Sequence, residues 1–377
     1  MLRKLCLFAF AASVSLTACM PVEPVQETVP SPEFTERITA SATAPGRLTR
    51  TQQATLSAVG DVLIHGTVYE DAKTATGYDF YPMFQPVESF LSQSDITFAN
   101  SESIIGGSEI GVSTYPSFNS PYEVGDAMKQ AGIDTVSMSN NHTLDRGIRA
   151  IENAHAHWDS LDIVTSGSAM SEQQRLEVPT IERNGITFSF LSYTYATNGV
   201  PTPSGRSYLV DRIDLDLIKS DLARATQQSD VAVVSLHFGV EYEAMPSLEQ
   251  IELAHFAAEH GADIILGHHP HVLQPPAWIE SSDGRRSFVI YSLGNFLSGQ
   301  QGVERQIGGI VHVEAELTET AEGSTVTIGN PRFTPTFTYS ADYRDFKVVL
   351  LKDVNEEWNE NTKTHMKTWM PELEFHE

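Results

Sequence analysis

The sequence predicts an α/β fold, because short apolar strands alternate with amphipathic helical segments from about residue 55 to residue 297. The strand signal is clearest at 231–236, which is rich in valine, and at 262–266, which is too short and too apolar for an amphipathic helix. The helical segments are 145–161, 214–228 and 247–260. With 377 residues, 41% of them hydrophobic, the chain can bury a large core, and its length is compatible with two domains.

The amino-terminal 19 residues are typical of a lipoprotein signal. Arg3 and Lys4 precede an apolar stretch, and the order Leu16-Thr17-Ala18-Cys19 matches a signal that is cleaved before an acylated cysteine. A transmembrane anchor is the alternative, but the stretch is short for a bilayer core of about 30 Å. We therefore expect lipid on Cys19 and an extracytoplasmic protein anchored to a bacterial membrane. Residues 20–54, rich in Pro, Thr, Ser and Glu, are expected to form a disordered tether.

The character of the chain changes again near its carboxyl end. We expect one domain over 55–315 and a β-rich extension over 316–377, because segments 310–317, 324–328 and 332–339 alternate polar and apolar residues as strands do. These strands either extend a sheet or form a small subdomain. Residues 353–377 are acidic and weakly patterned, and the sequence assigns them no structure.

Charge and cysteine content exclude several classes of protein. The formal net charge is −25, and removing Arg3 and Lys4 with the signal makes it −25 − 2 = −27, so the surface repels nucleic acid and other polyanions and we expect no nucleic-acid partner. The two cysteines are Cys6 and Cys19, so the processed chain has no disulfide and no thiol nucleophile. Neither a P-loop nor a Gly-x-Ser-x-Gly elbow occurs.

The most informative stretch is 265–271, where an apolar strand runs into His268, His269 and His271. Gly267 is expected to let the backbone turn sharply, which places the histidines at the carboxyl end of the strand, where open α/β sheets bind their ligands. A histidine-rich loop can also be an ordinary surface loop. The metal-site interpretation is favoured because the pattern recurs.

Four other apolar runs also end in polar side chains that bind metals or donate hydrogen bonds. They supply Asp61 with His65, Asn100 with Glu102, Asn141 with His142, and His237 with Glu241. Nitrogen and oxygen ligands without thiolate suit Zn, Mn or Fe rather than a cysteine-type structural zinc site. The candidates exceed what one ion needs, so we expect two divalent ions bridged by a carboxylate, as in metal-assisted phosphoryl transfer.

These motifs, taken in order, resemble the bacterial CapA family of poly-γ-glutamate capsule synthesis, which is similar to calcineurin-like metallophosphoesterases. The resemblance spans roughly residues 55 to 300. It is carried by Gly60-Asp61, Asn100-Ser101-Glu102, Asn140-Asn141-His142 with Asp145, His237-Phe238-Gly239-Val240-Glu241, Gly267-His268-His269-Pro270-His271 and Ser292-Leu293-Gly294-Asn295-Phe296. It implies a four-layer α/β/β/α sandwich.

The resemblance also implies roles for individual residues. The implied metal ligands are Asp61, Glu102, Asn141, His237, His269 and His271. His142 is implied to protonate a leaving group or to stabilise transition-state charge, with Asp145 accepting its other N–H. Asp145 has an alternative reading, because a carboxylate in a first helical turn is favoured by the helix dipole alone. The implied substrate contacts are His65, Asn100, Glu241, His268 and Asn295.

The chain departs from the family pattern at three positions. Leu63 stands where phosphoesterases carry a histidine two residues after the first aspartate, and His65 either replaces that histidine or contacts substrate. Ser101 stands where the family typically has leucine, and Glu102 stands where the wider superfamily has a bridging aspartate.

The expected function is that of a membrane-tethered, extracytoplasmic, metal-dependent hydrolase of the phosphoesterase type, associated with synthesis or export of capsule poly-γ-glutamate. Expected partners are the capsule polymer or a phosphoester substrate, together with membrane proteins of capsule synthesis. An amide hydrolase that cleaves γ-linked peptides would use the same metal chemistry. A non-catalytic, metal-binding capsule-assembly factor is the alternative from another class.

Overall fold

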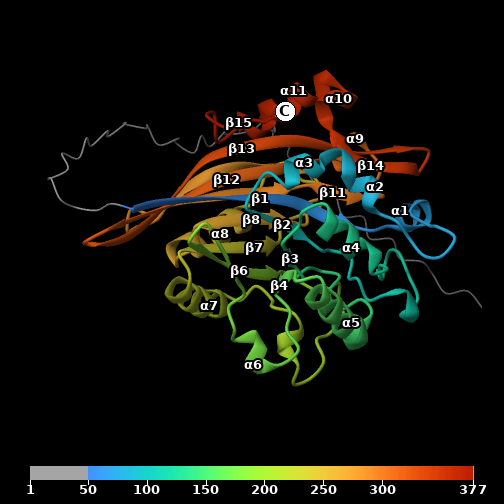
Figure 1. Ribbon diagram of the computed structural model, residues 1–377, viewed down its shortest axis with the longest axis horizontal. Coiled ribbons are helices and arrows are strands. Elements are labelled where there is room, and N and C mark those ends of the chain that lie inside the picture. The colour runs from blue at the N-terminus through green and yellow to red at the C-terminus, as the bar shows by residue number, and fades with distance from the viewer. Residues whose placement is uncertain (1–49, 377) are drawn as a thin grey trace, which may run out of the picture. The chain divides into compact units, whose positions relative to one another are not determined.

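The computed structural model describes residues 50–376, drawn as coloured ribbon in Figure 1. The predicted signal, Cys19 and residues 20–49 of the predicted tether lie outside the described residues. Strand β1 (Arg50–Leu63) begins five residues before the expected start of the folded domain at residue 55. Within residues 50–376, no helix is both long and apolar enough to span a bilayer.

The first sheet is built around β1 and is mixed. On one side β1 pairs in parallel with β2 (Ile96–Asn100), and the sheet continues through β3 (Thr135–Ser137) and β4 (Val164–Ser166). On the other side three antiparallel strands follow, namely β12 (Ile307–Thr320), β13 (Gly323–Ala341) and β14 (Arg344–Leu350). Two short strands are added in parallel, β11 (Asn295–Ser298) on β1 and β15 (Glu374–Phe375) on β13.

The second sheet has six strands. Their order is β5 (Thr180–Arg183), β6 (Ile186–Thr194), β7 (Val231–His237), β8 (Ile264–His268), β10 (Arg286–Leu293) and β9 (Leu273–Glu280). The four central strands β6, β7, β8 and β10 are parallel. Every residue of β7 and β8 is buried, as expected where both faces of a parallel sheet are covered.

Three apolar clusters separate four layers. Phe98 of the first sheet stacks on Phe190 of the second, with ring centroids 6.2 Å apart, within the cluster between the sheets. Helices α1 (Gly66–Asp71), α2 (Tyr81–Phe84), α3 (Glu88–Leu91), α4 (Glu123–Gln130) and α5 (Gly147–Ser160) lie on the side of the first sheet where Trp158 is buried. Helices α7 (Leu215–Gln228) and α8 (Leu248–Glu259) cover the second sheet, and Leu222 is buried there. The predicted four-layer α/β/β/α sandwich is confirmed (Figure 1).

Two helices begin where their capping residues predict. The Asp214 side chain accepts a hydrogen bond from the backbone N–H of Leu217 at the start of α7, and Ser247 and Gln250 form a reciprocal capping box at the start of α8. Helix α5 differs from the prediction, because it starts at Gly147 and Asp145 lies in the turn before it. The first-turn dipole reading of Asp145 is therefore wrong.

The carboxyl-terminal region belongs to the first sheet. Strand β12 crosses the expected boundary at 315/316, and the two strands expected at 324–328 and 332–339 form the single strand β13. A bulge interrupts its pairing near Asn330, which has a φ of 48°. Residues 353–377, unassigned from sequence, include all of α11 (Glu356–Met366), which follows α10 (Leu351–Val354). Helix α11 packs on β9 and β13. Helices α6 (Glu172–Arg175) and α9 (Val303–Gln306) are single turns.

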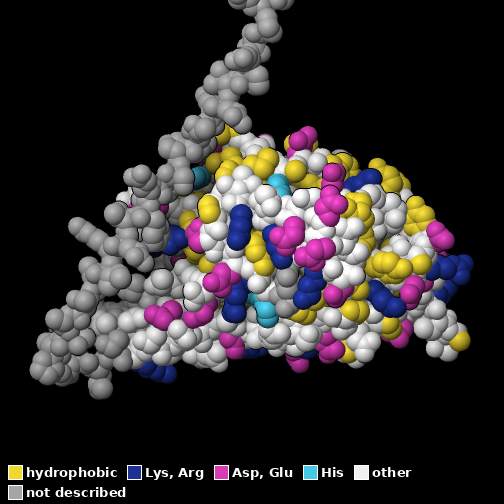
Figure 2. All heavy atoms as spheres, turned by 90° about the horizontal axis from the view of Figure 1, so that it is seen from above, with side chains coloured by type: hydrophobic (Ala, Val, Ile, Leu, Met, Phe, Trp, Pro, Cys, Tyr) yellow, Lys and Arg dark blue, Asp and Glu magenta, His cyan; other side chains and the backbone are white. Residues whose placement is uncertain are grey.

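The face of the molecule on which α10 and α11 lie carries charges of both signs. Figure 2 shows acidic and basic side chains interspersed on this face. The net charge of −25 is therefore not concentrated into one acidic patch on the face in view.

Candidate metal centre

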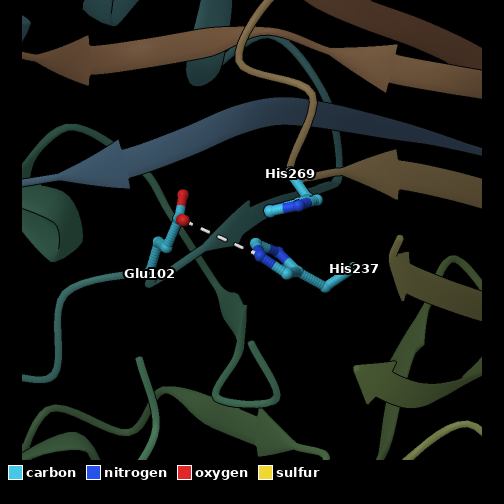
Figure 3. A group of neighbouring side chains, drawn as sticks. All are labelled: Glu102, His237 and His269. Atoms are coloured by element: carbon cyan, nitrogen blue, oxygen red, sulfur yellow. Dashed lines mark ion pairs between the residues drawn. The ribbon is translucent and has the colours of Figure 1, made fainter. Parts of the chain in front are cut away.

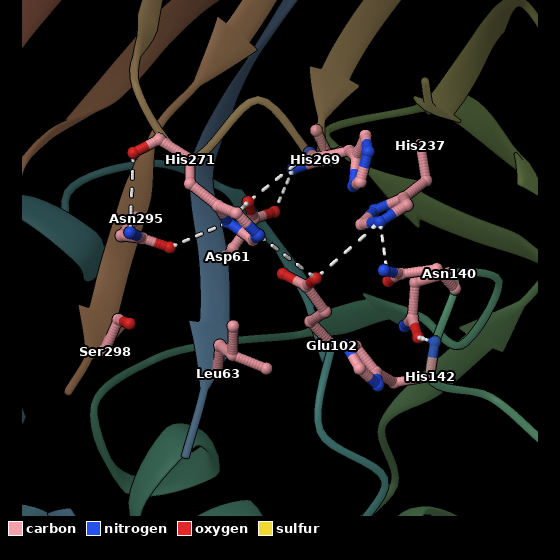
Figure 4. Close-up of polar contacts among 12 residues, drawn as sticks. Asp61, Leu63, Glu102, Asn140, His142, His237, His269, His271, Asn295 and Ser298 are labelled. Carbon is pink, nitrogen blue, oxygen red and sulfur yellow. Dashed lines mark hydrogen bonds and ion pairs between the residues drawn. The ribbon is translucent and has the colours of Figure 1, made fainter. Parts of the chain in front are cut away.

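The predicted site residues converge where strands of both sheets end. Asp61 lies on β1, and Glu102 and Asn141 follow β2 and β3 of the same sheet. His237 ends β7 of the second sheet, and His269 and His271 follow β8 (Figure 4). All six side chains are at most 3% exposed. The carboxyl ends of parallel strands from two facing sheets therefore form one buried site.

Glycines let the strands of this site approach closely. A Cβ on Gly60 would lie 2.0 Å from the carbonyl oxygen of Gly294, and one on Gly267 would lie 1.9 Å from that of Tyr291. Gly267 is part of β8 and does not form the expected turn. The turn is made by His269 and His271 themselves, with φ of 96° and 57°. Such left-handed backbone is uncommon for side chains other than glycine and often marks functional loops.

The first donor group contains Glu102, His237 and His269 (Figure 3). One ligand atom from each lies within 4.8 Å of the other two. His237 Nε2 lies 3.7 Å from Glu102 Oε1 and 3.0 Å from the amide oxygen Oδ1 of Asn141. Asn141 therefore faces the same point as the three residues of the group, as the predicted ligand set requires.

The second donor group contains Asp61, Glu102 and His271, again within 4.8 Å of one another. His271 Nδ1 is 3.0 Å from Asp61 Oδ2, and its Nε2 is 3.7 Å from Glu102 Oε1. Glu102 thus belongs to both groups, which is the position that a bridging carboxylate occupies. Neither of its oxygens accepts a hydrogen bond from the residues that the structure describes.

Burial and neighbouring charges shift the pKa values of four site residues in different directions. Burial and the neighbouring Asp61 carboxylate raise the pKa of Glu102 well above its usual value. Burial would also raise the pKa of Asp61, but the nearby His268 and His271 imidazoles outweigh it and hold that pKa low. Burial opposes charge on His271, yet Glu102 and Asp61 raise its pKa to about 9. Burial and the neighbouring His271 lower the pKa of His269 to about 3.

The donor set fits divalent cations. Buried carboxylate oxygens without hydrogen bonds are costly unless a cation neutralises them, and a cation that binds here displaces the protons of Glu102 and His271. The mixture of carboxylate, amide and imidazole donors suits Mn, Zn or Fe.

His142 and Asp145 form a buried pair beside these groups. His142 Nδ1 lies 2.7 Å from Asp145 Oδ2, which also accepts the backbone N–H of Phe118 at 2.7 Å. The Phe118 ring packs edge-on against the imidazole, with centroids 4.7 Å apart. These contacts fix the ring and direct Nδ1–H to the carboxylate, so Nε2 remains for a proton transfer.

Three of the predicted substrate contacts lie behind the candidate ligands. Asn100 donates its amide N–H to Asp61 Oδ1 at 2.8 Å, and His268 Nδ1 lies 3.3 Å from the same oxygen. Asn295 Oδ1 lies 3.1 Å from His271 Nδ1. All three are at most 1% exposed and hold candidate ligands in place, and their role as substrate contacts stays a prediction.

The other two predicted substrate contacts differ from each other. His65 Nδ1 accepts the backbone N–H of Gly299 at 3.2 Å, and His65 belongs to none of the donor groups among residues 50–376. Burial lowers its pKa to about 4. Glu241, in contrast, is exposed and forms a third donor group with His269 and His271.

Sequence reasoning missed two aromatic residues at the mouth of the site. Tyr195 and Tyr242 are 42% and 47% exposed. The Tyr195 ring lies 4.7 Å from that of His269, and the Tyr242 ring lies 6.2 Å from that of His271. Both lie in loops that follow strands of the second sheet, but a lone loop tyrosine gives no spacing signal that sets it apart from other surface residues.

Comparison with known proteins identifies the family. The model of the family described as bacterial capsule synthesis protein PGA_cap matches residues 55–300. The match covers more than half of the chain, so the chain belongs to this family, and the resemblance drawn from the motifs is confirmed.

The individual relatives and the solved structure share only a modest fraction of identical residues with this chain. The chain is 26% identical to PGA biosynthesis protein CapA of Bacillus subtilis (strain 168), over 80% of this chain and 79% of that protein. It is 28% identical to capsule biosynthesis protein CapA of Bacillus anthracis, over 69% of this chain and 63% of that protein. Among solved structures it is similar to calcineurin-like phosphoesterase YfkN from Bacillus subtilis, with 13% identity, a TM-score of 0.40 and coverage of 85% and 100% of the two chains.

Proposed function

We propose that the chain is a metal-dependent phosphoester hydrolase of bacterial capsule synthesis, held outside the cytoplasm by lipid on Cys19. Membership of the capsule synthesis family supports the biological setting. The two donor groups that share Glu102, next to the oriented His142 and Asp145 pair, are the observation that carries the chemistry.

Each part of the site has a task in this proposal. Divalent ions supply Lewis-acid chemistry, because they lower the pKa of water and neutralise charge on a phosphoryl oxygen. His142 donates a proton from Nε2 to the leaving oxygen, and Asp145 stabilises the imidazolium before and the correct tautomer after that transfer. Asn100 and Asn295 keep Asp61 and His271 in register with the ions.

Charge explains how an acidic protein can accept an anionic substrate. The Asp61 and Glu102 carboxylates contribute −2 to the centre, and two divalent ions contribute +4, so the balance at the centre is −2 + 4 = +2. A bound ion is the dominant charge within its own site, even where the surface potential is negative. A phosphate group is therefore attracted locally, while salt screens the surface charge beyond about 8 to 10 Å.

The test is hydrolysis of aryl phosphomonoesters and phosphodiesters by the purified full chain in mild detergent, with Mn or Zn added. We expect turnover that depends on metal. His142→Ala should lower kcat by two to four orders of magnitude, the usual contribution of a general acid, with metal content unchanged. His269→Ala should lose both metal and turnover.

Two outcomes would redirect the assignment. Stoichiometric metal without turnover on either ester, but with cleavage of a γ-glutamyl peptide, identifies an amide hydrolase. Metal binding without any turnover, together with normal capsule formation by His142→Ala cells, identifies a non-catalytic assembly factor.

A further inference from the structure

The two donor groups that share Glu102 are unequal. Glu102, His237 and His269 are joined by the Asn141 amide oxygen, which makes four protein donors. The group of Asp61, Glu102 and His271 has three. Zinc and similar ions take at least four ligands, and a carboxylate shared between two ions counts only once toward each. The second ion therefore has one protein ligand fewer.

The side chains two and four residues after Asp61 do not supply a fourth donor to this group. Leu63, two residues after Asp61 on β1, is apolar and 2% exposed. His65 packs its ring against Phe118, with centroids 5.1 Å apart, and belongs to none of the donor groups among residues 50–376. A fourth protein donor would therefore come from another element.

Glu241 comes from the loop after β7. One carboxylate oxygen lies within 4.8 Å of ligand nitrogens of both His269 and His271. Glu241 therefore shares His271 with the group of three donors and His269 with the group of four. Its side chain is exposed, whereas the Asp61 and Glu102 side chains are fully buried.

The backbone around Glu241 is restrained on one side by α8 and on the other by the histidine loop. Gly239 has a φ of 94°, and a Cβ there would lie 2.5 Å from the Gln250 side chain. Tyr242 has a φ of 69°, and its N–H donates to the carbonyl of Pro270 at 2.8 Å. Left-handed backbone at a bulky residue is costly and persists where surrounding contacts enforce it. The backbone that carries Glu241 is therefore held beside the histidine loop.

We propose that Glu241 is a metal ligand, which completes the coordination of the ion held by Asp61, Glu102 and His271. The inference rests on the proposed function only in requiring that the site binds metal. Three carboxylates against two divalent ions give a balance of −3 + 4 = +1 at the centre, so the site still attracts an anion. The fully buried Glu102, whose oxygens accept no hydrogen bond from residues 50–376, is shared by the two other donor groups.

The test measures metal binding directly. The metal-free full chain is titrated with Mn, and bound ions are followed by calorimetry and by electron paramagnetic resonance, which reports spin coupling between two adjacent Mn ions. We expect two ions in the wild type. Glu241→Gln, which keeps the shape and removes the charge, should weaken one ion at least tenfold, leave the other unchanged and abolish the coupling signal.

Matched variants separate this role from a general charge effect. Glu243→Gln removes an equally exposed carboxylate two residues away and should retain both ions. Leu63→His in the Glu241→Gln background places an imidazole beside Asp61 and should recover at least part of the lost affinity. Far-ultraviolet circular dichroism checks the folding of each variant.

The possible results are distinguishable. If the wild type binds two ions and Glu241→Gln binds both with unchanged affinity, Glu241 is not a ligand and the proposed function stands. If Glu243→Gln weakens metal as much as Glu241→Gln does, the effect is long-range charge and the inference fails. If the wild type binds no ion, the proposed function fails as well.

Discussion

Two buried asparagines show how single residues organise the centre. Asn100 donates to Asp61 Oδ1 and lies 3.3 Å from His237 Nδ1, so it joins the two sheets through one amide. Asn295 lies against His271 Nδ1 and donates to the backbone carbonyl of Arg305 at 2.9 Å. Such contacts hold a ligand in one rotamer and one tautomer, which is how residues around a metal site tune its affinity.

His312, far from the site in sequence, is a single residue that makes the stability of the fold depend on pH. It is 5% exposed on β12, and its Nδ1 lies 2.6 Å from Ser57 Oγ on β1. Burial lowers its pKa from 6.5 to about 4, so the unfolded chain binds a proton there more readily than the folded chain does. The stability that neutral His312 contributes is therefore complete above pH 6.5 and is lost as the pH falls toward 4.

We predict that His312→Gln, whose amide can still hydrogen-bond Ser57, loses less stability on acidification than the wild type. Between pH 7.5 and pH 4.5 the difference should be roughly 2 to 3 kcal/mol, from the linkage of proton binding to unfolding. Urea unfolding of both proteins in excess chelator measures it, so that metal loss is common to both. An identical acid-induced loss in the two proteins contradicts the prediction.

At the scale of elements, the centre depends on two glycines that let one strand lie close to the backbone of another. Gly60 brings β1 against the Gly294 carbonyl, where Asp61 N–H donates at 2.9 Å, and Gly267 brings β8 against the carbonyl of Tyr291 on β10. Each glycine is adjacent to a residue of the site. Strand spacing and ligand placement are therefore set by the same positions.

Gly267→Ala should be strongly destabilising, because its Cβ would lie 1.9 Å from a backbone oxygen that cannot rotate away. We expect a loss of about 3 kcal/mol or more, at the upper end of overpacking costs. Gly329→Ala is the control, because it also lies on a strand and a Cβ there meets no atom within 4 Å. Urea midpoints compare the two, and equal midpoints would rule out the close approach.

Elements with strong local signals could be predicted from sequence. The range 214–228 anticipated α7, because Asp214 ends the preceding extended chain and its side chain accepts the backbone N–H of Leu217 in the first turn. Helix α11 was not predicted within 353–377, because its sequence has no clear apolar face. Only Asn359, Thr362 and Met366 are buried, and two of these are polar. The strand β13 was expected as two, because Asn330-Pro331 resembles a turn and is a bulge inside one strand.

The site was predictable where its residues follow strands. The cluster of histidines at 268–271 was anticipated from the strand that precedes it, and the pair of His142 with Asp145 from the resemblance to the family. The approach of Glu241 to His269 was not, since it depends on the tie between Tyr242 and Pro270 across separate loops. Nor was the burial of Asn100 and Asn295, because it depends on how the two sheets face each other.

At the scale of the whole molecule, metal should stabilise the fold. Asp61 and Glu102 are buried like charges, and an ion that binds only the folded state adds RT ln(1 + [L]/Kd), or about 2.7 kcal/mol at a hundredfold excess over Kd. We expect Mn to raise the Tm of the wild type by several degrees and chelator to reverse the rise. Scanning calorimetry of wild type and His269→Ala measures this, and an unchanged Tm despite stoichiometric bound metal would contradict it.

The pairing of β1 determines how late in folding the candidate metal centre can form. One edge of β1 pairs with β12, with Arg50 opposite Glu319, and its carboxyl end pairs with β11, where Asp61 lies opposite Asn295. The first ligand along the chain is thus seated only by strands that are synthesised near the end. A chain that is still being synthesised or transported across a membrane cannot form the centre until most of its residues are available to fold. A metal ion that binds this centre would therefore be taken up in the compartment where the last strands pair, and the supply in that compartment would select the ion.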